Sequence, residues 1–379
     1  MRVVLFCHSL LSDWNHGNAH FLRGIVTELQ ARGHDVRVFE PRDAWSVENL
    51  VADAGANALD ETLRSYPGLD VRRYAAGTLD LDQALEGADL VLVHEWNPHD
   101  LVGQIGRHRA RGGRYTLLFH DTHHRSVTDE ASMSEYDLSG YDGVLAFGEV
   151  IRERYLRRGW ARRAWTWHEA ADVRRFSPRD AAATETDDQR TGGDLVWIGN
   201  WGDEERTGEL RDYLIEPVRR LRVKTRVYGV RYPEAAKREL AAAGIHYAGW
   251  LPNYLVADAF AKYRMTVHIP RRPYVERLPG IPTIRIFEAL ACGIPLVSCW
   301  WDDCESLFRP GRDYLVVRTP GQMEEAVTAL LSDPEHAAAV ARSGRETILE
   351  RHTCAHRVDE LLAIAASLRL SSIERVLTA

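Results

Sequence analysis

Residues 283–298, TIRIFEALACGIPLVS, hold a helix signal, a turn signal and a strand signal in close succession. Thr283 is an acceptable N-cap, and the pattern predicts a helix over about 284–291 that stops near Gly293. The apolar run over 295–299 predicts a buried strand. A helix that passes through a tight turn into a buried strand is typical of parallel α/β sheets, so this stretch predicts the fold class.

Two charged residues, Arg285 and Glu288, interrupt the apolar character of the predicted helix. Its first turn has free N–H groups and the positive end of the helix dipole, which together favour an anion. Arg285 in that turn is unfavourable by itself, and a bound anion such as a diphosphate would explain it. Glu288, one turn further on, suits hydrogen bonds to a vicinal diol such as a ribose. From the residues alone, a structural carboxylate held by backbone donors fits Glu288 equally well.

The same alternation of apolar runs and amphipathic helices extends along most of the chain. Strands are predicted near residues 2–9, 35–40, 89–94, 114–119, 143–147, 194–198, 225–230, 265–269, 295–299 and 314–317. This order predicts two Rossmann-like doubly wound domains that face across a cleft. The expected parts are an N-terminal domain (1–176), a linker (177–193), a C-terminal domain (194–352) and a C-terminal helical segment (353–379) packing back toward the first domain.

The loops that follow the predicted strands carry unusual polar residues. Histidines, aromatics and arginines, rather than plain serine and lysine, fill the loops at 8–20, 95–97, 120–125, 199–208 and 270–283. Ligands of open parallel sheets bind beyond the carboxyl ends of the strands. The sequence therefore predicts a polar binding site at these ends.

The composition of the chain argues against several classes of protein. The 379-residue chain has a net charge of −7, which argues against a stable nucleic-acid partner. Its five cysteines include no CxxC pair and suit a reducing cytoplasm. No stretch reaches the roughly 18 apolar residues of a membrane span, and peripheral membrane contact stays open. No G-x-G-x-x-G follows the first predicted strand, which disfavours an NAD-dependent dehydrogenase.

The segment PTIRIFEALACGIPLVS resembles the donor-site helix of GT-B glycosyltransferases, especially the family-4-like retaining group (glycosyl transferases group 1) and its CgeB-like branch. That group has an E-x7-E motif, and Glu288 matches its second glutamate, which binds the ribose hydroxyls. The first glutamate falls on Gly280, where an acid beside the donor sugar is missing. The backbone N–H groups of Gly280 and Ile281 are expected to serve instead, and Glu276 is a candidate substitute.

The resemblance also implies a donor site around this helix. These enzymes generally need no catalytic metal, so cations or amides must hold the diphosphate, and guanidinium suits bidentate phosphate binding. Arg206 and Arg285 are the first candidates, ahead of Arg231, Arg271 and Arg272. The expected donor-binding residues are Glu288, Arg285, Thr283, Arg206, Gly199, Asn200, Trp201, Trp250, Gly280, Ile281, His16 and Gly17.

The first domain is expected to bind the acceptor and to supply the catalytic groups, which we predict to be His120, Asp121 and His20. An imidazole oriented by a neighbouring carboxylate is a workable general base at neutral pH.

The predicted function is therefore that of a glycosyltransferase, a hexosyltransferase that uses a UDP-sugar or GDP-sugar with retention. Its acceptor would be a small molecule, a glycan or a peptide, and it would need neither metal nor further cofactor. A nucleotide-sugar 2-epimerase of the same architecture, or a non-catalytic nucleotide-sugar-binding protein, remains an alternative.

Overall fold

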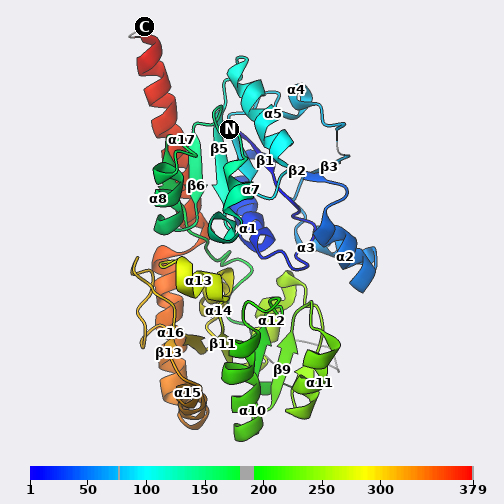
Figure 1. The fold of residues 1–379 in the computed structure, drawn as a ribbon, viewed down its shortest axis with the longest axis vertical. Coiled ribbons are helices and arrows are strands. Elements are labelled where there is room, and N and C mark those ends of the chain that lie inside the picture. The colour runs from blue at the N-terminus through cyan, green and yellow to red at the C-terminus, as the bar shows by residue number, and fades with distance from the viewer. Residues whose placement is uncertain (76, 180–191, 378–379) are drawn as a thin grey trace. The chain divides into compact units, whose positions relative to one another are not determined.

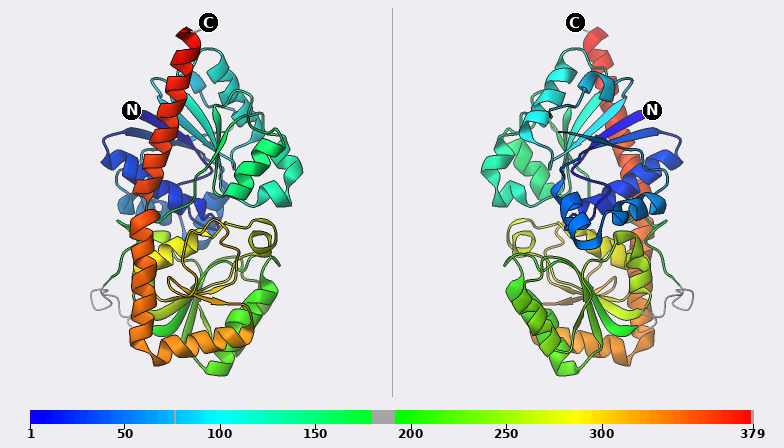
Figure 2. Two further views of the ribbon diagram at one scale, coloured as in Figure 1. Left: turned by 90° about the vertical axis from the view of Figure 1, so that its left-hand side faces the viewer. Right: turned by 90° about the vertical axis from the view of Figure 1, so that its right-hand side faces the viewer.

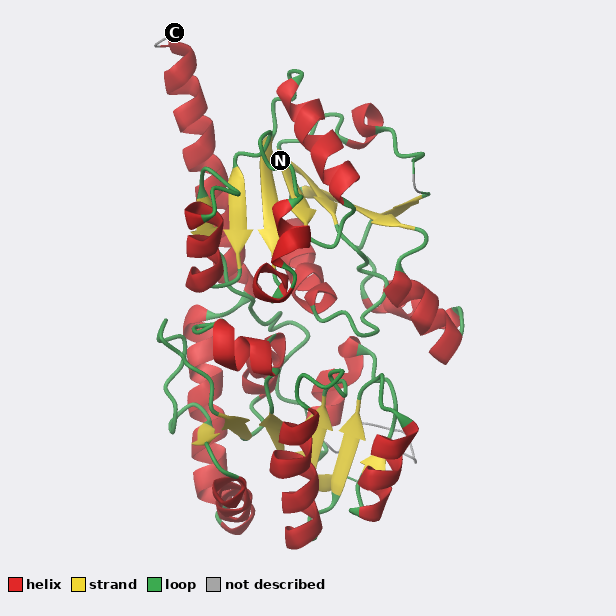
Figure 3. Cartoon of the chain, in the orientation of Figure 1, coloured by secondary structure: helices red, strands yellow, loops and turns green. Residues whose placement is uncertain are grey.

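The computed structural model describes residues 1–75, 77–179 and 192–377. These residues form two compact units (Figure 1). One unit comprises Met1–Glu169 together with the C-terminal helix, and the other comprises Ala170–Thr353. Each unit has its own parallel sheet with helices on both faces (Figure 3). This confirms the predicted class of two doubly wound α/β domains.

The sheet of the first unit has the order β3-β2-β1-β4-β5-β6-β7. Its strands are β1 (Arg2–Phe6), β2 (Asp35–Pro41), β3 (Val71–Tyr74), β4 (Leu90–His94), β5 (Thr116–Asp121), β6 (Gly143–Ala146) and β7 (Ala164–Thr166). Every pairing in this sheet is parallel, and Val4 of β1 pairs with Arg37 on one side and Val91 on the other. The strand order reverses beside β1, which is where open α/β sheets bind their ligands.

Helices cover both faces of this sheet. They are α1 (Asn18–Ala31), α2 (Trp45–Ala54), α3 (Asn57–Ser65), α4 (Leu81–Ala84), α5 (His99–Ala110), α6 (Arg125–Thr128), α7 (Glu130–Ser134), α8 (Glu149–Arg157) and α17 (Cys354–Leu377). The last helix returns to the first unit, as predicted, and runs alongside it (Figure 2). Trp167 Nε1 donates a hydrogen bond to the carbonyl of Arg357 (2.8 Å), and Arg32 at the end of α1 pairs with Asp359 (2.5 Å).

The sheet of the second unit has the order β10-β9-β8-β11-β12-β13, again with parallel pairings. Its strands are β8 (Gly193–Ile198), β9 (Thr225–Tyr228), β10 (His246–Tyr247), β11 (Tyr263–His268), β12 (Leu296–Cys299) and β13 (Leu315–Val317). The α-helices are α9 (Thr207–Leu210), α10 (Glu216–Leu221), α11 (Glu234–Ala242), α12 (Val256–Phe260), α13 (Arg272–Arg277), α14 (Ile284–Cys292), α15 (Pro320–Ser332) and α16 (Pro334–Arg351). A π-helix η3 (Arg211–Ile215) and a 3-10 helix η4 (Asn253–Leu255) complete the unit.

Alternating side chains of this sheet feed two separate hydrophobic cores. Trp197 and Cys299 belong to the core that also contains Leu214 of η3. Val196 and Leu296 belong to the opposite core, which includes the apolar side of α14. The period of two along each strand sends neighbouring residues to opposite faces.

The structure departs from the predicted boundaries in a few places. Residues 170–176 group with the second unit rather than the first, because Ala171 and Phe176 pack in its core. Most of the predicted linker, residues 180–191, lies outside the described residues. The short strands β3, β7 and β10 were not predicted. Among the described helices, none has both the length and the apolar character needed to cross a membrane.

Candidate functional site

The last residue of β11, His268, links that strand to the start of α14. His268 Nδ1 is 2.9 Å from the hydroxyl of Ser298, and its Nε2 is 3.0 Å from the hydroxyl of Thr283. Burial, with the charges of Arg206 and Arg285, lowers the pKa of His268 to about 3. The imidazole is therefore neutral at pH 7 and fixes the position of Thr283.

Helix α14 starts and stops where the sequence predicts. Thr283 is the N-cap, and Gly293 ends the helix in the left-handed conformation with φ of +67°. The Thr283 hydroxyl, however, bonds His268 rather than a helix N–H. The first turn contains no acidic residue, so its N–H groups form a potential anion site at the end of β11.

Arg206 lies at the same strand end and is 8% exposed. Its guanidinium donates to the carbonyl of Ile269 (3.0 Å) and to that of Asn200 (2.5 Å), and lies 5.1 Å from the Trp197 ring centroid. Among the described residues it has no carboxylate partner, and its buried Nε has no hydrogen-bond partner. Burial and the neighbouring Arg271 lower the pKa of Arg206 to about 9, so it stays a cation at pH 7.

Glu288 is fully buried and held by two side chains. One oxygen accepts a hydrogen bond from Asn253 Nδ2 (2.9 Å), and the other pairs with Arg285 (2.5 Å). Both of these donors are side chains. This ion pair also corrects the argument for Arg285, because Glu288 already neutralises its charge at the helix start.

The three predicted donor-binding residues in the loop after β8 have different surroundings. The Asn200 side chain accepts a hydrogen bond from the N–H of Val230 (2.9 Å), while its carbonyl accepts one from Arg206. Trp201 is 5% exposed, packs in the core against Tyr232 and also lines a pocket with Thr207 and Arg231, so its contact with a donor stays a prediction. Gly199 is needed for packing, because a Cβ there would lie 2.5 Å from the Trp197 ring.

Gly280 shows why an acid is missing from its position. It has φ of +84°, which disfavours any side chain, and an added Cβ would lie 2.5 Å from Oε1 of Glu305. Its N–H donates to the carbonyl of Asp302 (2.6 Å), and Ile281 is 1% exposed. The N–H of Gly280 is therefore already bonded and is not free to contact a donor sugar as predicted. The carboxylate of Glu305 lies directly beside Gly280.

The remaining candidates of the second unit lie apart from this strand end or are ion-paired. Trp250 is half-buried in the loop after β10. Arg231 pairs with Asp203 (3.0 Å), and Arg271 pairs with Glu205 (2.8 Å). Arg206 is thus the strongest anion ligand among the predicted arginines.

In the first unit, four buried imidazoles lie in sequence at the carboxyl ends of β1, β4 and β5. Ring centroids are 5.1 Å apart for His8 and His16, 6.4 Å for His16 and His94, and 5.2 Å for His94 and His120. Burial lowers the pKa of each, to about 4 for His8 and about 3 for His120. In the described part of the chain, His16 Nε2 and both nitrogens of His120 have no hydrogen-bond partner.

The predicted pairing of His120 with Asp121 is wrong. Both residues lie within β5, so their side chains point to opposite faces of the sheet. His120 contacts Phe21 and Trp167, whereas Asp121 accepts a hydrogen bond from Tyr155 (2.9 Å). With its pKa near 3, His120 is also a weak base at pH 7.

The face of Asp121 holds a second buried carboxyl group, Glu95, which is fully buried after β4. Burial and the neighbouring Asp121 raise the pKa of Glu95 well above its usual range. Of the other predicted residues, His20 is buried in the first turn of α1, and Gly17 is exposed just before that helix.

Sequence reasoning missed three residues that shape the site: His268, Asn253 and Glu305. His268 carries a detectable signal, because an imidazole ends a mainly apolar strand there, as His94 does in the first unit. Asn253 precedes α14 by about 30 residues, and Glu305 follows it in an irregular segment. No local pattern marks either residue.

Comparison with known proteins agrees with this architecture. Residues 206–363 match a family described as glycosyl transferase-like. A sucrose-phosphate synthase from Thermosynechococcus elongatus superposes with a TM-score of 0.67 at 16% identity, covering 98% of this chain and 100% of that chain. No curated protein matches the sequence.

Two further solved structures carry nucleotides. Anabaena HepE in complex with UDP and glucose gives a TM-score of 0.65 at 13% identity, covering 97% of this chain and 100% of that one. An alpha-glucosyltransferase in complex with UDP gives 0.68 at 11% identity, covering 97% and 100%. These identities establish likeness of fold alone. The chain therefore has the GT-B fold of glycosyltransferases, and its residues 206–363 are similar to the glycosyl transferase-like family.

Proposed function

We propose that the protein is a glycosyltransferase that moves a sugar from a nucleoside diphosphate sugar to an acceptor hydroxyl. The observation that carries this proposal is the buried guanidinium of Arg206 at the end of β11, which has no carboxylate partner among the described residues. A buried cation without a counter-charge is costly, and a bound anion compensates for it.

The start of α14 supports the same conclusion. His268, the last residue of β11, bonds Thr283 at the helix N-cap, while Ile269, the next residue, accepts from Arg206. A guanidinium and a helix N-terminus thus belong to one strand end, an arrangement that suits a diphosphate. Glu288, one turn into α14, is the proposed partner of the ribose hydroxyls, which would displace the hydrogen bond from Asn253 or that from Arg285.

In the proposed reaction, the bond between the anomeric carbon and the diphosphate breaks, and a bond to the acceptor oxygen forms. The acceptor hydroxyl loses its proton, and the nucleoside diphosphate leaves. Arg206 and the N–H groups of α14 stabilise the charge that develops on the leaving group. Because these fixed groups supply positive charge, we propose transfer without a metal or further cofactor. Retention at the anomeric carbon is proposed from the resemblance to the family-4-like retaining group alone.

The first unit is the proposed acceptor side. Unbonded nitrogens of His16 and His120 at the carboxyl ends of its strands suit contacts with hydroxyl groups. The solved structures in complex with UDP and with UDP-glucose favour a UDP-sugar and a hexose as the donor. The proposed acceptor is a small molecule, a glycan or a peptide, and the free thiols suit a reducing cytoplasm.

Nucleotide binding tests the proposal. Calorimetry with UDP, GDP and TDP is expected to show binding by the full chain and about tenfold or greater loss in Arg206→Gln. Glu288→Gln should also weaken binding, because a carboxylate accepts hydrogen bonds from a diol better than an amide does. Arg220→Gln, which removes an exposed guanidinium paired with Glu324, is the matched control and should bind normally.

A turnover assay then separates the alternatives. The assay measures release of UDP from a UDP-sugar, with and without a panel of acceptors. Release should continue when EDTA is present. His120→Ala and His20→Ala are expected to lower turnover more than nucleotide affinity. Binding of none of the three nucleotides would disprove the proposal, and epimerised donor without transfer would replace it by the 2-epimerase.

A further inference from the structure

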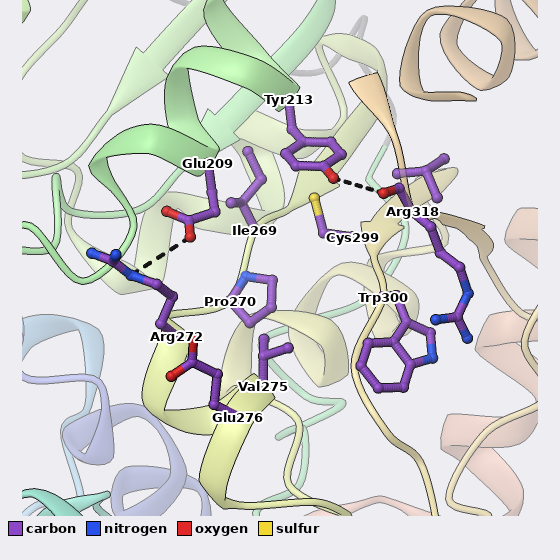
Figure 4. A pocket seen from close by; sticks show the side chains of 11 residues that line it. Glu209, Tyr213, Ile269, Pro270, Arg272, Val275, Glu276, Cys299, Trp300 and Arg318 are labelled. Atoms are coloured by element: carbon purple, nitrogen blue, oxygen red, sulfur yellow. Dashed lines mark hydrogen bonds and ion pairs between the residues drawn. The ribbon is translucent and has the colours of Figure 1, made fainter. Parts of the chain in front are cut away.

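A cavity of about 270 Å³ lies at the carboxyl ends of β11, β12 and β13 in the second unit (Figure 4). Ile269, Cys299 and Val317 from these three strand ends line it. All three belong to the core on the face covered by η3, whereas α14 packs on the opposite face. The sheet therefore separates the cavity from Glu288 and from the apolar side of α14.

Two aromatic side chains form rigid walls of this cavity, Tyr213 and Trp300. The Tyr213 hydroxyl donates a hydrogen bond to the carbonyl of Arg318 (2.9 Å). The Arg318 guanidinium lies over one face of the Trp300 indole, 4.4 Å from the ring centroid. Because both rings are held by Arg318, they present fixed apolar surfaces.

The polar part of the lining contains two carboxylates beside two guanidiniums. Glu209 and Glu276 both line the cavity, on the side where Arg272 lies (Figure 4). Arg272 Nε is 3.6 Å from one oxygen of Glu209, but its guanidinium also donates to the carbonyls of Glu204 and Glu205. The other oxygen of Glu209, Oε2, is buried and has no hydrogen-bond partner among the described residues.

We propose that this cavity binds a compact, neutral, polyhydroxylated molecule of about monosaccharide size. Hydroxyl groups of the ligand would donate to Glu209 and Glu276, and its C–H surface would pack on Tyr213 and Trp300. A buried acceptor without a partner calls for a donor.

Two features of the cavity set the class of ligand. The guanidiniums of Arg272 and Arg318 offset the two carboxylates in its lining, which favours a neutral ligand over a cation. A volume of about 270 Å³ lies just below the usual range of small-molecule sites, so it fits a monosaccharide-sized ligand better than a whole nucleoside diphosphate sugar.

This site has its own ligand groups, but it neighbours the proposed nucleotide site, since Ile269 lines the cavity and its carbonyl accepts a hydrogen bond from Arg206. Arg206 is the N-cap of α9, and Glu209 is the third residue of that helix. Polyol binding should therefore be measured both alone and with nucleotide present. Failure of nucleotide binding leaves the polyol site untouched, so the two proposals fail separately.

Saturation-transfer NMR on the full chain with D-glucose, myo-inositol and putrescine tests the proposal. We expect saturable binding of at least one of the two polyols and none of putrescine. Val275→Trp should abolish polyol binding by filling the cavity, and it lies on α13, a helix with no buried residues. Glu209→Gln should weaken binding about tenfold, while Glu335→Gln, an exposed carboxylate elsewhere in the unit, should leave it unchanged.

Each other outcome overturns the proposal. Binding of putrescine without polyols would identify a cation site. Polyol binding that persists in a folded Val275→Trp protein and in Glu209→Gln would place the ligand elsewhere. Displacement of the polyol by UDP in the wild-type protein would assign it to the nucleotide site, and absence of polyol binding would leave the cavity without this ligand.

Discussion

Two buried arginines show how surroundings decide the use of the same side chain. Arg23 is 1% exposed and pairs with Asp13 at 2.9 Å, so its charge is neutralised inside the first unit. Arg206 is almost as buried but bonds only carbonyl oxygens among the described residues. The two arginines differ in whether a carboxylate neutralises the charge, and not in how deeply the side chain is buried. A bound anion would therefore stabilise Arg206 but not Arg23.

Glu305 should take the place of the acid missing at Gly280. Its carboxylate lies beside Gly280, at the approach to α14, so Glu305→Gln is expected to lower kcat/KM for the nucleotide sugar about tenfold or more. UDP binding should change little, because Glu305 is proposed to contact the sugar. Glu276→Gln is the matched comparison, and steady-state kinetics beside UDP calorimetry is the measurement. A larger loss in Glu276→Gln would reverse the assignment.

Acid should destabilise the first unit through His120. Burial lowers its pKa to about 3, so between about pH 6.5 and pH 3 the unfolded chain binds the proton and the folded chain does not. The stability that His120 contributes is therefore present above pH 6.5 and is lost as the pH falls. One such histidine changes the free energy of unfolding by up to about 1.4 kcal/mol per pH unit.

The free energy of unfolding of the wild type and of His120→Phe is measured with denaturant at several pH values. Phenylalanine cannot be protonated and suits the aromatic surroundings of residue 120. The variant should lose less stability between pH 6.5 and pH 4.5, whereas exposed His246→Gln should follow the wild type. Equal slopes for wild type and His120→Phe would show that His120 is protonated in the folded protein.

At the scale of elements, the contact between α14 and α16 depends on a glycine. Gly344 lies in the middle of the 18-residue helix α16, where glycine is normally unfavourable. A Cβ there would lie 2.5 Å from the carbonyl oxygen of Asp313 and 2.7 Å from Cδ2 of Leu290. Glycine is therefore retained so that α16 can approach α14, the helix of the candidate site.

Gly344→Ala should destabilise the protein by about 1–3 kcal/mol, because the backbone of Asp313 cannot move aside as a flexible side chain would. Thermal unfolding checks this against Gly321→Ala, an exposed helical position whose nearest such contact is 4.0 Å away. The control should be neutral or slightly stabilising. An equal effect of both substitutions would contradict the packing argument.

At the scale of the whole molecule, the first unit is built from two separated pieces of chain. Residues 1–169 need α17, whose buried residues include Val358 and Leu361, and Trp167 depends on the carbonyl of Arg357. The second unit is continuous and has its own two cores. The two connections run side by side, since Ala171 and Thr353 form a β-bridge.

A fragment of residues 170–353 should therefore fold alone, whereas residues 1–169 should not. Joining residues 1–169 to 354–379 through a short glycine-serine linker should restore a folded first unit. Circular dichroism melts and the dispersion of NMR spectra distinguish these outcomes. A cooperative transition in the 1–169 fragment alone would show that α17 is dispensable.

The sequence by itself determined the features that depend on neighbours in the chain. Apolar periodicity located the main strands of both sheets, and the Thr283 and Gly293 signals placed both ends of α14. Glu288 stands out locally as a carboxylate within an apolar helix, whereas Arg206 is indicated by the resemblance to GT-B glycosyltransferases. Because β5 extends to Asp121, two residues beyond the predicted end of the strand, alternation along it places His120 and Asp121 on opposite faces.

Only the tertiary structure decided which side chains meet. Arg285 pairs with Glu288, Trp201 enters the core, and Glu305 lies against Gly280. Caps and periodicity are local and are carried by a few consecutive residues, whereas a buried side chain takes its partner from whatever the topology brings beside it. The buried guanidinium of Arg206, which bonds only carbonyl oxygens among the described residues, is of the second kind, and it is the feature from which the proposed function follows.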